Sequence, residues 1–281
     1  MAAVRIPVGQ REWITPAEQL DRVRERSPVL EQLNGVFHVT DVAKLALEYI
    51  EDPCIAAVSR ALEALRKIGL LPAHIPALPK NMGQILNEKC PIHGDEAGPD
   101  GTSLKIWQTH SLYLLPPGTL NELEARVSAY GRAHLAEYGR ENPLQFRYFW
   151  NAARQEHGDT RFDEPQWVLM SNDVLPGSRN QPYERHVEMV GELSEKAFVP
   201  FEVPSLRAAV GVTLLHKVAT GESILQAGNE QNGNVHTYTR VGETTGSYHV
   251  AVGGSAPSGV GVSSDYGGDG EGIGVSALWK F

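Results

Sequence analysis

Apolar residues recur at helical spacing in the N-terminal part of the chain. Between Pro53 and Gly69 they fall three or four positions apart, as one face of a helix requires: Ile55, Val58, Leu62, Leu65 and Ile68. Pro53 suits the first turn of a helix and Gly69 its C-terminal end. Two shorter helices are expected over 15–26 and 40–50, so residues 1–71 are predicted to form a small helical module.

Prolines then interrupt the helical pattern. Their spacing in the segment 71–79 favours an extended, semi-rigid chain, so residues 72–103 are predicted to be a linker or loop with a short helix near 82–86. Beyond it the pattern is mixed. Strands are expected over 106–115 and 167–170, and helices over 119–138, 182–197 and 204–220, with a half-buried aromatic segment over 146–151.

Glycine dominates the C-terminal region, where short β-prone runs alternate with glycine turns. The runs 236–241, 248–252, 260–262 and 273–281 predict an antiparallel meander. The chain thus runs from a helical N-terminal module, through a mixed α/β middle, to an antiparallel Gly-rich β C-terminus. Because strands and helices do not alternate regularly, this order favours an α+β fold, with residues 104–281 as one α+β domain.

Composition narrows the class of protein. The 281 residues are 41% hydrophobic and 21% charged, values typical of a globular protein. Two cysteines, Cys54 and Cys90, do not make a disulfide scaffold. The net charge of −9 repels phosphate backbones, so nucleic acid is not expected as a partner. No leader or membrane-spanning run is recognised, which favours a cytoplasmic protein without a membrane partner.

Several short motifs resemble one family of proteins. They are LPKNMGQIL (78–86), CPI (90–92), Thr109-His110, WVLMS (167–171), DVLPGSRN (173–180), VAVGG (250–254) with AP (256–257), and the final Lys280-Phe281. From about residue 79 onward the chain resembles a bacterial family abundant in amoeba-associated chlamydiae, some members of which carry F-box-like segments. The resemblance implies no established activity and no catalytic residues.

Cys90 and His93 are the first candidates for chemistry. A thiol and an imidazole at this spacing can bind one zinc ion, but a structural zinc needs four ligands and no second close pair exists. Alternatively, Cys90 with His93 or His110 could form a thiolate–imidazolium pair. A hydrolase that uses Cys90, or a carboxylate–histidine pair with Asp173 as a further candidate, is therefore an alternative function. No cofactor is expected, because no phosphate-binding glycine motif is complete.

The loop 173–180 is the preferred binding site. It follows a predicted buried strand and leads into a helix, where binding residues often collect. Asp173 can accept protons or bind a ligand, Ser178 and Asn180 can cap, and Arg179 can fork onto a carboxylate or phosphate. A structural pairing of Arg179 with Asp173 is the other reading of the same residues.

The helix over 53–68 offers a further alternative. Its sequence is similar to the recognition helix of winged-helix proteins, with Ser59, Arg60, Arg66 and Lys67 as candidate DNA contacts. The proline-rich segment that follows does not resemble a basic wing. With no complete catalytic motif, the leading hypothesis is a binding or interaction protein whose helical module docks a partner protein. A homo-oligomer is also possible.

Overall fold

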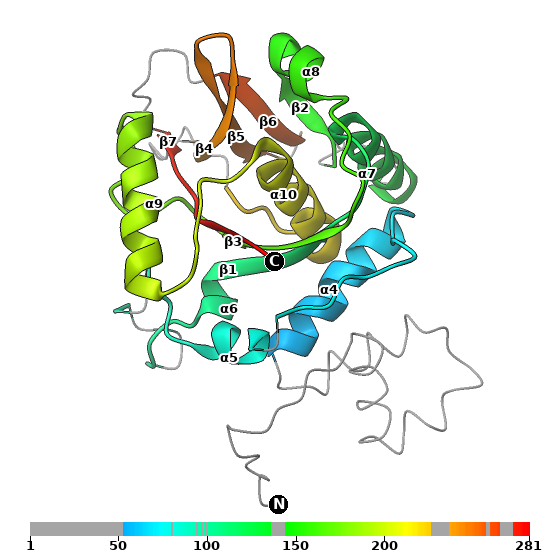
Figure 1. Cartoon of the computed structure of the whole chain (residues 1–281). Helices are drawn as coiled ribbons and strands as arrows, with labels where there is room; N and C mark the ends of the chain where they lie inside the picture. Colours follow the sequence, from blue (N-terminus) through cyan, green and yellow to red (C-terminus); the bar gives the residue numbers. More distant parts are fainter. Residues whose placement is uncertain are drawn as a thin grey trace, which may run out of the picture.

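The computed structural model describes residues 53–79, 81–93, 95–96, 98, 101–135, 144–225, 236–256, 259–264 and 272–281. Within these ranges the chain has an α+β fold in which helices pack around two separate sheets (Figure 1). The helices predicted over 15–26 and 40–50 lie outside the described residues.

The described elements follow the order that the sequence predicts, with three additions. The helices are α4 (Pro53–Lys67), α5 (Met82–Asn87), α6 (Ile106–Thr109), α7 (Leu120–Leu135), α8 (Asn151–His157), α9 (Tyr183–Ala197) and α10 (Leu206–Thr220). The strands are β1 (His110–Leu115), β2 (Phe146–Phe149), β3 (Gln166–Ser171), β4 (Tyr238–Thr245), β5 (Tyr248–Ala256), β6 (Gly259–Ser264), β7 (Ile273–Gly274) and β8 (Leu278–Lys280). Helices α6 and α8 were not predicted, and the aromatic segment over 146–151 contains an unpredicted strand, β2. Helix α6 shortens the expected strand over 106–115 to its second half.

The antiparallel meander predicted for the C-terminal region is confirmed for β4, β5 and β6, but the expectation that the last run, 273–281, continues it is wrong. Strands β4, β5 and β6 are antiparallel, but β2 pairs parallel to β6 and β7 parallel to β4, in the order β2-β6-β5-β4-β7. The last strand, β8, joins the other sheet, whose order is β1-β3-β8. Short β-prone runs separated by glycine turns indicate which neighbouring strands pair. They do not indicate the partners of β2, β7 and β8, which come from distant parts of the chain.

Helix α10 lies between the two sheets (Figure 1). Every residue from Leu206 to Val218 is buried, which is what a helix covered on all sides requires. Its ends carry regular caps: the Ser205 hydroxyl accepts from the amide of Ala208, and Gly221 closes the helix with a left-handed φ of 78°.

Helix α4 belongs to the same hydrophobic core as β1 and α10, although its sequence was predicted to form a separate module. Its buried face combines Leu65 with two alanines, Ala61 and Ala64, whose small side chains allow a close approach. The extended segment after α4 is also held against the core, because the Trp167 indole donates to the carbonyl of Pro76 at 2.8 Å. No helix in the described ranges combines the length and the apolar composition that crossing a bilayer requires.

Candidate functional site

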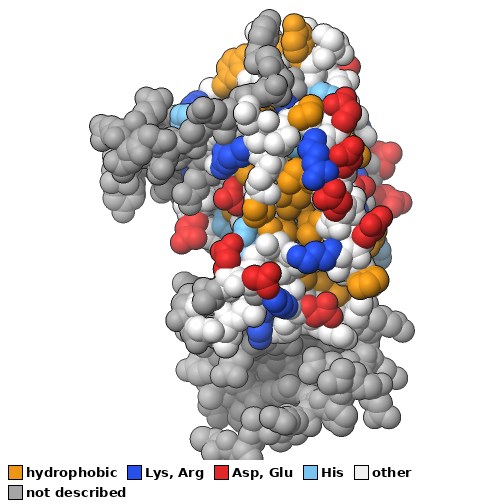
Figure 2. Space-filling model, turned by 90° about the vertical axis from the view of Figure 1, so that its left-hand side faces the viewer, with side chains coloured by type: hydrophobic (Ala, Val, Ile, Leu, Met, Phe, Trp, Pro, Cys, Tyr) orange, Lys and Arg blue, Asp and Glu red, His pale blue; other side chains and the backbone are white. Residues whose placement is uncertain are grey.

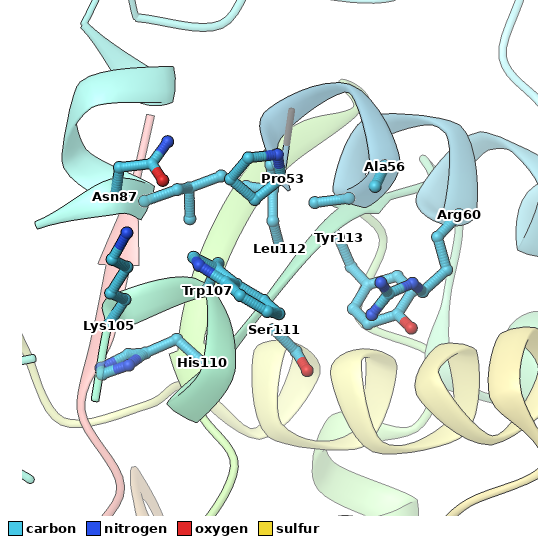
Figure 3. A pocket seen from close by; sticks show the side chains of 12 residues that line it. Pro53, Ala56, Arg60, Asn87, Lys105, Trp107, His110, Ser111, Leu112 and Tyr113 are labelled. Atoms are coloured by element: carbon cyan, nitrogen blue, oxygen red, sulfur yellow. The ribbon is translucent and has the colours of Figure 1, made fainter. Parts of the chain in front are cut away.

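A pocket of about 350 Å³ lies between α4, the end of α5, α6 and β1 (Figure 3). Strand β1 is the edge strand of its sheet, so it has a neighbouring strand on one side only. Helices α4 and α6 contact it as well. The lining side chains come from all four elements and from the residue before α6: Pro53, Ala56, Ala57, Arg60, Leu86, Asn87, Lys105, Trp107, His110, Ser111, Leu112 and Tyr113.

Small side chains on α4 leave this volume open. Pro53, Ala56 and Ala57 form its wall on that side, at positions where longer apolar residues would fill the space between α4 and β1. Trp107, in the first turn of α6, is 44% exposed and forms another part of the wall. A large, half-exposed indole beside a cavity provides a flat surface on which an organic molecule can pack.

The pocket is cationic. Arg60 and Lys105 line it, whereas no acidic residue does so within the described part of the chain. In the same ranges, neither cation forms an ion pair or a side-chain hydrogen bond. Among the described residues the two cations thus stand unpaired in one cavity, in a chain whose net charge is −9.

Tyr113 adds an unpartnered hydroxyl. Its side chain is only 1% exposed, yet the hydroxyl has no hydrogen-bond partner among the described residues. Burial raises the pKa of Tyr113, so the phenol keeps its proton and can donate at neutral pH. Arg60 extends from α4 toward Tyr113 (Figure 3) and acts electrostatically on it. A buried donor without a partner is unfavourable, and a ligand that accepts from it would remove that cost.

Ser111, Asn172 and His216 form a buried polar network beside the pocket. The Ser111 hydroxyl donates to Asn172 Oδ1 at 2.6 Å, and its oxygen lies 3.0 Å from His216 Nδ1. Because a hydroxyl has one proton, the second contact is donated by His216. Burial, with Arg60 nearby, lowers the pKa of His216 to about 4. His216 therefore holds its proton on Nδ1 and cannot remove one from Ser111, so this trio does not form a nucleophile–base pair.

The structure brings Cys90 and His110 together through Thr109. The Thr109 hydroxyl lies 3.1 Å from Cys90 Sγ and 2.9 Å from His110 Nδ1. Cys90 is only 1% exposed and does not line the pocket, and burial lowers the pKa of His110 to about 3. A buried thiol behind the wall, next to an imidazole that stays neutral, gives a substrate no access to a nucleophile.

The His93 ring lies close enough to lower the pKa of His110 further, but its hydrogen bond is to Glu96 and not to Cys90 or His110. The His93 backbone amide donates to Cys90 Sγ at 3.3 Å, whereas the ring nitrogen lies 2.9 Å from the exposed carboxylate of Glu96. Across the described ranges, no three His, Cys, Asp or Glu side chains are placed to bind one metal ion.

The loop 173–180 uses its polar groups within the fold. The Ser178 hydroxyl is fully buried and bonds the carbonyl of Leu175 and the amide of Val275. Arg179 donates to Thr237 Oγ1 at 2.8 Å and lies 3.9 Å from Asp173. Asn180 has a left-handed φ of 58° and also bonds this C-terminal segment, through its backbone amide to Ile273. The Asp173 carboxylate is thus used by Arg179 and by the backbone amide of Val174. No hydrogen bond or ion pair among the described residues joins it to Cys90 or His110, although the next residue back, Asn172, bonds the carbonyl of Thr109 through its amide.

The candidate DNA contacts on α4 do not share one exposed face. Ser59 is buried, and Arg60 lines the pocket. Arg66 pairs with Glu63 at 2.8 Å, and Lys67 reaches the carbonyl of Val218 on α10. A helix that reads the major groove must leave such side chains free for bases and phosphates.

The outer face of α9 is the other exposed surface of note. Figure 2, which views the side where α9 lies in Figure 1, shows acidic and basic side chains interspersed on it. Arg185 pairs there with Glu188 and Glu192, and Phe198 protrudes at the end of the helix with 95% of its surface exposed. Paired charges with single apolar residues between them are ordinary for a protein surface.

Most residues that line this pocket were not predicted from the sequence as functional. Arg60 and His110 were candidates for other roles, whereas Lys105, Trp107 and Tyr113 were not singled out. Tyr113 lies in a strand whose sequence predicts only a buried core strand, and the spacing of its residues does not indicate that the hydroxyl lacks a partner.

Comparison with family models, with curated proteins and with solved structures finds no match to this chain.

Proposed function

We propose that this protein is a binding protein whose ligand is a small organic molecule held in the pocket between α4 and β1. One observation carries the proposal: two cations and a buried phenol line that cavity without an ion-pair or hydrogen-bond partner among the residues that the structure describes. A volume of about 350 Å³ lies within the range of small-molecule sites. The family resemblance adds no ligand to this proposal.

Binding is preferred to catalysis because each candidate nucleophile lacks an essential feature. Cys90 is buried and does not line the pocket. Ser111 donates its hydroxyl proton in a hydrogen bond to Asn172 and accepts a hydrogen bond from His216, so no base among the described residues is placed to activate it. A binding protein needs only the recognition groups that line the cavity.

A ligand-detected NMR screen of small neutral, anionic and cationic fragments tests the proposal on the full chain. The variant Ala56→Trp fills the pocket from α4, whereas Ala133→Trp places the same side chain on the exposed face of α7. We expect fragments that bind the wild type and Ala133→Trp but not Ala56→Trp. If no fragment shows this pattern, although circular dichroism shows all three proteins folded, the pocket is not a ligand site.

A further inference from the structure

We propose that the pocket selects an organic dianion that carries an acidic group at each end of an apolar body. This inference rests on the proposed function and adds the class of ligand. It follows from the positions of the two cations, which lie toward opposite ends of the cavity, with apolar side chains between them (Figure 3).

Arg60 and Tyr113 form one end. The guanidinium has no carboxylate partner in the described ranges, and the phenol has no acceptor. A carboxylate placed here would accept from both groups, and hydrogen bonds of this kind to an ionised acceptor are strong. One bound oxyanion would thus pair a free cation and remove the cost of a buried, unused donor.

Lys105 and Asn87 form the other end. The lysine is half-buried and lacks an ion pair within the described residues. The Asn87 amide nitrogen donates to the carbonyl of Gly83 at 2.9 Å, and its second proton is available for an oxyanion. Lysine acts here as a point charge that tolerates several ligand geometries.

The middle of the cavity is apolar. Pro53, Ala57, Leu112 and Trp107 line it between the two cationic ends. Pro53 and Arg60 lie about two turns apart on α4, so the wall that this helix contributes is about 10 Å long. A linear aliphatic or aromatic diacid can lie along this wall with one acidic group toward each cation.

Ligands of other charge would fit this arrangement less well. A monoanion leaves one cation unpaired, a neutral molecule leaves both unpaired, and a dication meets like charge at each end. Discrimination thus comes from unmatched groups as well as from attraction.

Calorimetric titration of the full chain with dicarboxylates of increasing length (succinate, glutarate, adipate and suberate) tests the inference. Hexanoate supplies a monoanion, adipamide a neutral analogue and hexamethylenediamine a dication. We expect the best diacid to bind about tenfold or more tightly than hexanoate, and the amide and diamine to bind more weakly still.

Variants locate the two ends. Arg60→Gln and Lys105→Gln should each weaken the best diacid by about tenfold or more, whereas only one of them should weaken hexanoate. Tyr113→Phe should weaken the diacid without removing a charge. Arg126→Gln removes an exposed charge from α7 and should leave the affinity unchanged.

The failures of the two proposals are distinguishable. If fragments bind in a way that Ala56→Trp abolishes, but diacids bind no better than adipamide or hexanoate, the pocket is a ligand site and the dianion inference is wrong. The same conclusion follows if Arg60→Gln and Lys105→Gln leave diacid affinity unchanged. If nothing binds in the pocket, both proposals fail.

Discussion

His216 shows how one buried side chain links the pocket to the stability of the fold. It donates to Ser111 from α10, packs edge-on against Tyr113 with ring centroids 6.0 Å apart, and lies close enough to Arg60 to be affected by its charge. All three of these neighbours line the pocket. The imidazole is therefore part of the support that fixes the pocket wall, and its charge state matters to the native structure.

The pH dependence of stability should carry the signature of this histidine. Its pKa is about 4 in the native protein, whereas the pKa of histidine in an unfolded chain is about 6.5. Below a pH of about 6.5 this histidine becomes protonated in the unfolded chain but stays neutral in the native protein. The free energy of unfolding therefore falls, by up to about 1.4 kcal/mol per pH unit, until the pH reaches the native pKa.

The variant His216→Asn removes the contribution of this histidine to the pH dependence of stability and keeps a hydrogen-bond donor near the position of Nδ1. In urea unfolding at a series of pH values between 7 and 4, the stability of the wild type should fall more steeply than that of the variant. Parallel curves over this interval would show that His216 does not stay neutral in the native protein.

At the scale of elements, the sequence predicts helices better than strand partners. Helix α4 could be predicted from one apolar stripe and Gly69, and α10 from Ser205 and Gly221. The pairing of β7 with β4 could not, because β7 is only two residues long and is held by the loop 173–180 as well as by the sheet. That loop was predicted as a loop, but the spacing of its polar residues did not show that the fold itself uses them.

Gly274, in β7, is the position where this contact is tightest. A methyl group there would lie 2.5 Å from Ser178 Oγ and 2.8 Å from Val174 Cβ, both on the loop 173–180. Because the Val174 Cβ is fixed to the backbone, Gly274→Ala must push β7 away from the loop. Overpacking of this kind costs about 1–3 kcal/mol, which chemical denaturation would measure.

Gly191 provides the matched control. It lies in the middle of α9, where an added methyl group meets nothing within 4 Å. Gly191→Ala should therefore stabilise the protein by up to about 1 kcal/mol, as expected for this exchange inside a helix. Equal effects of the two substitutions would mean that β7 does not depend on close contact with the loop.

At the scale of the whole molecule, the core joins elements that the sequence places in different units. One hydrophobic cluster contains Leu65 of α4, Trp167 of β3, Leu214 of α10 and Leu278 of β8. Periodicity along the chain identifies such residues as buried, but it does not show which of them meet. The pocket is hidden from sequence for the same reason, since its walls come from α4, α5, α6 and β1 and its function depends on groups that have no partner after folding.

The shared core predicts that α4 unfolds together with the sheets. Leu65 is 0% exposed, so Leu65→Ala leaves a cavity in that core and should lower the free energy of unfolding by about 2–5 kcal/mol. Leu71, 44% exposed just after α4, is the control, and Leu71→Ala should change stability by less than about 0.5 kcal/mol. Far-ultraviolet circular dichroism and tryptophan fluorescence should report one coincident transition in urea for all three proteins, because Trp167 and Trp279 lie in or against the same core. An independent helical module would instead give a separate transition, and Leu65→Ala would then shift that transition alone while the fluorescence of the core stayed at its wild-type midpoint.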